Sequence, residues 1–198
     1  MNTVLKWAGA IARQWRLLSA SLVAAAIVHI LLTLSSAQFA EATSYQVLSK
    51  DLPVNQATFG KPVTAATQPL PFFSPDALYS FCRYDASTTR IRVSAILPDV
   101  GWSLSLHTPK GENFYFVPGN GRRSTDIDLV LVPPGDVFAH GNIEVNRSNK
   151  SIPQIKLPHV RGLVILRAPV KGLAYRRQID EQRGAFRCQA QHAARRPR

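Results

Sequence analysis

The stretch LLSASLVAAAIVHILLTL, residues 17–34, determines how this chain is organised. It contains no Lys, Arg, Asp or Glu. At about 1.5 Å per residue it spans about 27 Å as a helix, close to the hydrocarbon core of a bilayer at about 30 Å. We therefore expect a transmembrane helix near the N-terminus, with most of the chain on the far side of the membrane.

The charge of the chain supports one orientation of this helix. The formal net charge is +12, and it is concentrated at the two ends. Residues 1–16 hold three basic and no acidic side chains, residues 161–198 hold ten basic against two acidic, and the part between holds 11 against 10. A basic flank favours a cytoplasmic N-terminus, and long domains cross the membrane largely regardless of their charge.

A cleaved signal peptide is the main alternative to a retained anchor, because Ser35, Ser36 and Ala37 offer a small-residue cleavage site. The long basic region and the length of the apolar run favour the anchor. We expect a bacterial inner-membrane protein with a periplasmic C-terminal domain. Its predicted segments are a cytoplasmic flank (1–16), an anchor (17–34), a connecting tether (35–72), a β-rich periplasmic domain (73–190) and a basic tail (191–198).

Alternating apolar residues predict a mainly β (α+β) domain. Ile91, Val93, Ala95 and Leu97 share one face of a strand, and residues 102–107 alternate even more strictly. Turns rich in Pro, Gly and Asn separate these strands from others. The pattern indicates an antiparallel β-sandwich or barrel-like domain, with further strands at 113–117, 126–132, 143–146, 152–157 and 162–168.

Two short helices are expected at the ends of this domain. Ser74 is a suitable N-cap and Pro75 a suitable first helical residue, so a helix of two or three turns is predicted to lead to Cys82. Tyr175, Ile179, Gln182 and Phe186 recur at helical spacing, which predicts a C-terminal helix ending near Cys188.

Several short pieces, taken in their order along the chain, resemble a known family. They are PLPF (69–72), CRYD (82–85), WSLSL (102–106), GENFY (111–115), GLVILR (162–167) and the closing Cys188. The chain resembles small bacterial integral membrane proteins of the domain-of-unknown-function family numbered twelve fifty-four. The resemblance covers roughly residues 50–190 and the N-terminal span. It implies an inner-membrane protein with a β-rich periplasmic domain and no catalytic residues to carry over.

The two cysteines are expected to form a disulfide in an oxidising periplasm, tying the two ends of the domain together. The alternative is two free or buried thiols. A metal pair is disfavoured, since Cys82 and Cys188 form no C-x-x-C motif. We accordingly expect no metal and no cofactor.

Other chemical motifs are weak. His107, His140 and His159 could meet carboxylates, but their spacing matches no metal-ligand motif. Ser103 or Ser105 with His107 lacks the G-x-S-x-G context of a hydrolase. Residues 119–124, GNGRRS, suggest a phosphate loop but are better explained as a hairpin turn. Trp102 and Tyr115 could form an aromatic ligand face, although core packing is the simpler interpretation.

These observations favour a membrane-anchored envelope interaction or structural module without catalytic activity. Its basic C-terminus could contact anionic lipid or an envelope polyanion, and an envelope protein is a further possible partner. The alternatives are an envelope enzyme or small-ligand binder with a pocket between sheets, and a nucleic-acid-binding protein, which export disfavours. The residues proposed for the anionic contact are Arg176, Arg177, Arg195, Arg196 and Arg198.

Overall fold

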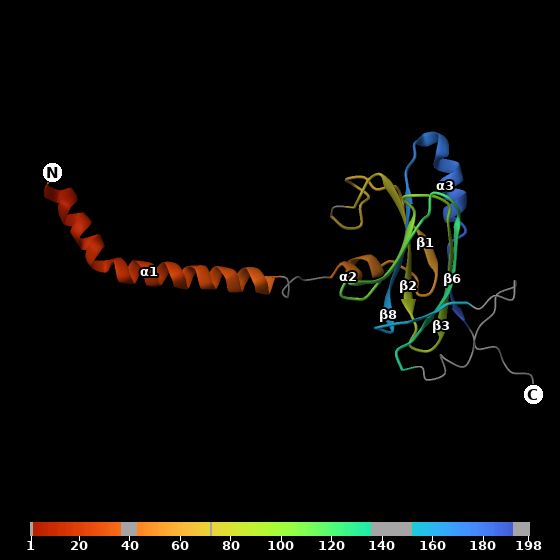
Figure 1. Cartoon of the computed structure of the whole chain (residues 1–198), viewed down its shortest axis with the longest axis horizontal. Helices are drawn as coiled ribbons and strands as arrows, with labels where there is room; N and C mark the ends of the chain where they lie inside the picture. Colours follow the sequence, from red (N-terminus) through yellow and green to blue (C-terminus); the bar gives the residue numbers. More distant parts are fainter. Residues whose placement is uncertain (1, 37–42, 72, 136–151, 192–198) are drawn as a thin grey trace, which may run out of the picture. The chain divides into compact units, whose positions relative to one another are not determined.

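The computed structural model describes residues 2–36, 43–71, 73–135 and 152–191, with side chains described from residue 14 onward. The chain divides into two compact units, residues 1–41 and 42–198. The first unit contains helix α1 (Asn2–Ser36). The second contains two β-sheets and the helices α2 (Ser44–Ser49) and α3 (Arg176–Arg183) (Figure 1).

Helix α1 contains a 22-residue window, Gln14–Ser35, with a mean hydropathy of 2.3 and no buried residue. Its hydroxyl groups are satisfied within the helix. Ser21 Oγ donates to the Leu18 carbonyl at 2.9 Å, and Thr33 Oγ1 donates to the His29 carbonyl at 2.8 Å. Such internal bonding removes the cost of placing a hydroxyl in hydrocarbon. Length and composition therefore suit either a membrane anchor or a signal sequence.

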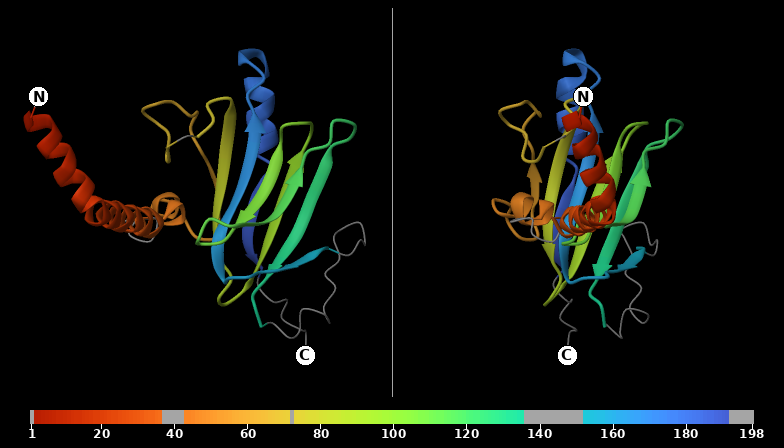
Figure 2. Two further views of the ribbon diagram at one scale, coloured as in Figure 1. Left: turned by 60° about the vertical axis from the view of Figure 1, so that its left-hand side comes forward. Right: turned by 90° about the vertical axis from the view of Figure 1, so that its left-hand side faces the viewer.

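The β unit is built from one five-stranded and one four-stranded sheet (Figure 2). The first, sheet A, has the order β1-β2-β8-β4-β5, and every pairing in it is antiparallel. Its strands are β1 (Ala57–Phe59), β2 (Ala77–Asp85), β4 (Ser103–His107), β5 (Asn113–Pro118) and β8 (Arg161–Pro169).

The second sheet, sheet B, has the order β7-β6-β3-β9. Strands β6 and β7 run parallel, and the other pairings are antiparallel. Its strands are β3 (Arg90–Leu97), β6 (Thr125–Val132), β7 (Gln154–Lys156) and β9 (Arg187–Gln191). The mainly β fold class is confirmed, and the sheets form a sandwich.

The core lies between the two sheets because each strand turns alternate side chains inward. Strand β2 contributes Leu78, Cys82 and Tyr84, and β3 contributes the predicted face of Ile91, Val93, Ala95 and Leu97. Trp102, Leu104, Leu106, Leu129 and Leu131 join the same cluster. Helix α3 adds the buried Ile179, so it covers one end of the core rather than lying apart from it.

The predicted helix after Ser74 is wrong, because residues 77–85 form strand β2. Their alternation places Leu78, Cys82 and Tyr84 in the core, and the strand pairs with β8 along its whole length. Ser74 Oγ hydrogen-bonds the Asp76 carboxylate instead of capping a helix. Pairing in a buried sheet has overridden the local capping signal.

The C-terminal helix is confirmed, but it ends earlier than predicted. Its C-cap is Gly184, whose N–H donates to the Asp180 carbonyl at 2.9 Å. Phe186 is fully buried, and Cys188 lies on strand β9, opposite Val93. Strand pairing with β3 therefore stops the helix before the cysteine. The predicted strand at 143–146 lies outside the described residues.

Candidate functional site

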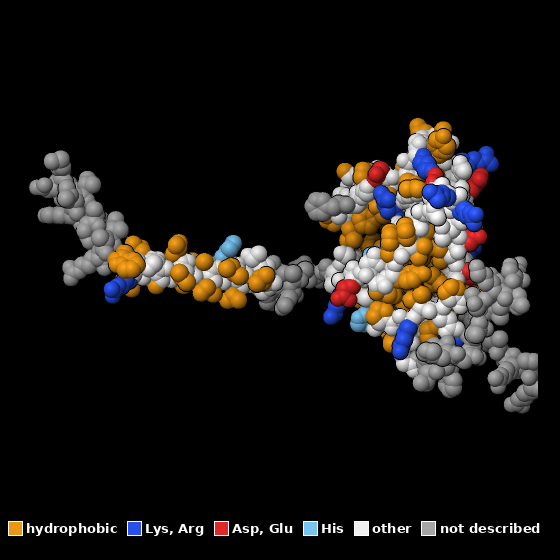
Figure 3. Space-filling view, viewed as in Figure 1, with side chains coloured by type: hydrophobic (Ala, Val, Ile, Leu, Met, Phe, Trp, Pro, Cys, Tyr) orange, Lys and Arg blue, Asp and Glu red, His pale blue; other side chains and the backbone are white. Residues whose placement is uncertain are grey.

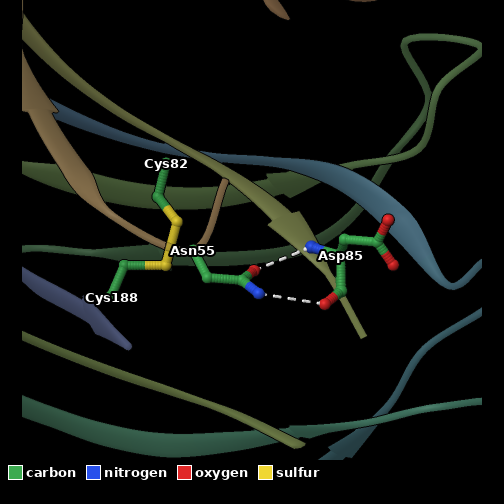
Figure 4. The surroundings of a disulfide bond; sticks show 4 residues. All are labelled: Asn55, Cys82, Asp85 and Cys188. Carbon is green, nitrogen blue, oxygen red and sulfur yellow. Dashed lines mark hydrogen bonds between the residues drawn. A yellow bond between two sulfur atoms is a disulfide. The ribbon is translucent and has the colours of Figure 1, made fainter. Parts of the chain in front are cut away.

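The structure joins Cys82 and Cys188 in a disulfide between the two sheets (Figure 4). Cys82 lies on β2 and Cys188 on β9, with Cα atoms 6.3 Å apart and both residues buried. The bridge joins β2, the second strand of the β unit, to β9, its last described strand. A buried cross-link of this kind is typical of proteins folded in an oxidising compartment.

A side-chain clamp lies close to this bridge. The Asn55 side chain accepts from the Asp85 N–H at 2.8 Å and donates to the Asp85 carbonyl at 3.1 Å (Figure 4). Asn55 adopts a positive φ of 57°, which Asn tolerates better than most residues. The clamp connects the segment before β1 to the end of β2, so residues 43–71 contribute to the domain fold.

A cationic cavity of about 440 Å³ opens at the α3 end of the sandwich. We use this name for the cavity lined by Arg122, Arg123, Lys171, Asp99, Trp102 and Ile179. Three segments meet here: the turn after β3, the turn between β5 and β6, and the region of α3. Figure 3 shows Lys and Arg side chains interspersed with Asp and Glu side chains at this end of the domain.

One carboxylate of the cavity is held in its charged form. Lys171 hydrogen-bonds Asp99, and the Val100 N–H donates to the same carboxylate at 2.6 Å. Both contacts lower the pKa of Asp99 below its usual range. Arg122 and Arg123 are exposed, and no ion pair to either is found within the described part of the chain. The cavity therefore has an excess of positive charge.

A second, apolar pocket of about 260 Å³ lies beside α2 on the outer side of sheet A. Phe73, Tyr79 and Phe81 form an aromatic cluster in it, with the Tyr79 and Phe81 rings stacked at a centroid distance of 6.2 Å. We call it the aromatic pocket. It was missed from the sequence because residues 74–82 were assigned to a helix, whereas in strand β2 Tyr79 and Phe81 lie on the same face.

A buried arginine ties α3 to sheet A. Arg183 is 3% exposed and donates to the Gly60 carbonyl at 3.1 Å, the Tyr79 carbonyl at 3.0 Å and Ser80 Oγ at 3.2 Å. It also pairs with Asp180 at 3.1 Å. Burial lowers the pKa of its guanidinium, while Asp180 opposes that shift. These contacts indicate a structural role for Arg183. Nothing in the sequence distinguishes Arg183 from the exposed arginines nearby, Arg176 and Arg177.

The proposed aromatic ligand face remains a prediction. Trp102 is 2% exposed and borders the cationic cavity, whereas Tyr115 lies on β5 opposite Leu106 and packs against the core. Trp102 immediately precedes β4 and Tyr115 lies on β5, so the two side chains have different surroundings.

Residues proposed for an anionic surface are only partly described. Arg176 pairs with Asp180 and Arg177 pairs with Glu181, each at 3.1 Å. Arg195, Arg196 and Arg198 lie outside the described residues. The anionic contact remains a prediction.

The histidines do not gather at one place within the described residues, where no cluster of potential metal ligands occurs. His107 Nε2 lies 3.0 Å from Ser105 Oγ, and its Nδ1 lies 3.4 Å from the Gly111 carbonyl. This pair faces away from the core on the outer side of β4. His159 is exposed, and His140 lies outside the described residues.

The sequence matches no family model and no curated protein. Its structure resembles the VPA0106 protein from Vibrio parahaemolyticus, with a TM-score of 0.53 and 12% identity, over 77% of this chain and 36% of that one. A second similarity, to an uncharacterised protein from Burkholderia cenocepacia, has a TM-score of 0.34 and 11% identity. It covers 70% of this chain and 34% of that one, and is too weak to support a shared fold. The chain spans about a third of the length of each match.

Proposed function

We propose that the chain is a single-pass inner-membrane protein that holds a non-catalytic interaction module in the periplasm. The observation that carries this proposal is the combination of one apolar helix with a buried disulfide in the following unit. The family numbered twelve fifty-four is the assignment that the sequence motifs favour.

The helix supports retention in a membrane. Its uncharged apolar run, residues 17–34, is longer than the about 7–15 residues of a signal-peptide core, and its hydroxyls are internally bonded. Lys6, Arg13 and Arg16 precede this run and favour a cytoplasmic N-terminus. The module would then lie on the opposite side of the membrane.

The disulfide supports the same compartment by an independent route. Cytosolic thiols are kept reduced, whereas the periplasm oxidises them. Because both sulfur atoms are buried between the sheets, the bridge belongs to the folded core rather than to an exposed redox switch.

Two single cysteines test the orientation. Thr3→Cys and Lys110→Cys would each be introduced into the full chain, expressed in a Gram-negative host, and treated with a membrane-impermeant maleimide after outer-membrane permeabilisation. We expect Cys at position 110, on an exposed turn, to be labelled in intact cells, and Cys at position 3 to be labelled only after lysis. The wild-type chain is the control, since its native cysteines are paired. The reverse labelling pattern would contradict the orientation.

A further inference from the structure

We propose that the cationic cavity binds a phosphate monoester carried on a sugar-sized body. This inference does not rest on the membrane anchor, because every residue it uses lies in the β unit.

The two arginines are presented by a fixed turn. The Gly119 N–H donates to the Trp102 carbonyl at 2.7 Å, and the Arg122 N–H donates to Asn120 Oδ1 at 3.1 Å. At Gly119 a Cβ atom would collide with the Asp99 carbonyl oxygen, so only glycine allows the turn to approach this closely. The backbone of the arginines is thus ordered before a ligand arrives, which reduces the entropic cost of binding.

The charge of the cavity matches a phosphate monoester. Arg122, Arg123 and Lys171 contribute three positive charges, and Asp99 contributes one negative charge. Since Lys171 and Asp99 neutralise each other, the two arginines provide the excess. A phosphate monoester carries about −1.5 to −2 at neutral pH, and its oxygens suit the planar fork of a guanidinium.

The rest of the cavity suits a compact polar body attached to that phosphate. Its volume of about 440 Å³ lies in the range of small-molecule pockets, about 300–1,000 Å³. Trp102 and Ile179 form an apolar wall of the cavity, and Gln178 and Gln182 supply amide donors and acceptors on α3. A sugar offers hydroxyl groups that can hydrogen-bond the amides and an apolar ring face that can pack against the apolar wall.

Isothermal titration calorimetry of the full chain in dodecyl maltoside tests this proposal, with glucose 6-phosphate as the probe. We expect saturable binding of glucose 6-phosphate, at least tenfold weaker binding of inorganic phosphate, and none of glucose. The variant Arg122→Gln/Arg123→Gln should bind glucose 6-phosphate at least tenfold more weakly. The control Lys50→Gln/Lys110→Gln removes the same charge outside the cavity and should retain the wild-type affinity within twofold.

Both double variants alter exposed side chains, and equal urea midpoints would show that their folds are intact. Absence of saturable binding, or unchanged affinity in Arg122→Gln/Arg123→Gln, would overturn the proposal. Equal binding of inorganic phosphate would overturn the sugar-sized body. Equal weakening in the control variant would show that only the net charge of the domain matters, and would also overturn the site.

Discussion

Loss of the Cys82–Cys188 bridge should strongly destabilise the β unit. The two cysteines are 106 residues apart, and a loop of about 100 residues corresponds to about 4–5 kcal/mol in the chain-entropy account of cross-linking. Because the bridge joins β2 to β9, its loss also frees sheet B from sheet A at that point. We expect reduction to lower the free energy of unfolding by about 4 kcal/mol.

Urea unfolding of the full chain in nonionic detergent measures this effect. In a Trp7→Phe/Trp15→Phe background the buried Trp102 is the single fluorescent tryptophan, so its emission reports the β unit. With a denaturant slope of about 2 kcal/mol per M, the midpoint should fall by about 2 M on reduction. Cys82→Ala/Cys188→Ala should show a similar midpoint and no response to reductant. A shift below about 0.5 M on reduction would refute the stabilising role of the bridge.

The same unfolding assay tests three further predictions. Arg183→Met should lower the free energy of unfolding by about 3 kcal/mol, because the Gly60 and Tyr79 carbonyls lose their charged hydrogen-bond donor. A loss below about 1 kcal/mol would argue against a structural role for Arg183. Gly162→Ala should lower the free energy of unfolding by about 2–3 kcal/mol, because the added Cβ would collide with Tyr84 Oη and the His107 carbonyl. Gly111→Ala is the comparison: its Cβ would meet open space, so only the positive φ of 88° should cost stability, about 1 kcal/mol. Equal losses in the two variants would argue against close packing at Gly162. Hydrogen bonds from Ser87 and Arg161 lower the pKa of the Asp85 carboxyl in the folded protein below its ordinary value. The ionised Asp85 should therefore stabilise the fold above about pH 4, and this stabilisation should be lost as the pH falls through the pKa of Asp85 in the folded state. Asp85→Asn should show a shallower loss of stability below pH 4, and an unchanged acid profile would contradict this contribution.

The sequence was sufficient for the parts of the fold where periodicity is strong. Strand β3 has the predicted bounds, Arg90–Leu97, because its alternating apolar residues have one possible inner face. Strands β4, β5, β6 and β8 lie within one or two residues of prediction for the same reason. The apolar helix is equally clear, since its length and lack of acidic residues need no tertiary context.

Strand β2 shows where local signals fail. Ser74 and Pro75 are good helix-start residues, but the strand gains a full antiparallel partner in β8 and places Cys82 in the core. That partner lies about 80 residues away in the sequence, so no local pattern could reveal it. Strands β1 and β9 were missed because short segments of mixed residues become strands only through their partners, β2 and β3.

The candidate sites were less accessible to sequence reasoning than the fold. Residues 119–124 form a turn as predicted, with a bridge between Asn120 and Arg123, but it connects two sheets rather than the paired strands of a β-hairpin, since β5 and β6 belong to different sheets. Their cavity, however, is completed by Lys171, which lies between β8 and α3, and by Ile179 of α3. This arrangement depends on the packing of α3 against the end of the sandwich. The disulfide was predictable because only two cysteines are present.

We propose that a retained membrane helix holds an oxidised β domain outside the cytoplasm, and intact mass spectrometry is the decisive test. Free thiols would be trapped with an alkylating reagent in living cells, and the protein would then be isolated from alkali-washed membranes. We expect a full-length chain with no alkylated cysteine. A soluble chain with both Cys82 and Cys188 alkylated would rule the proposal out.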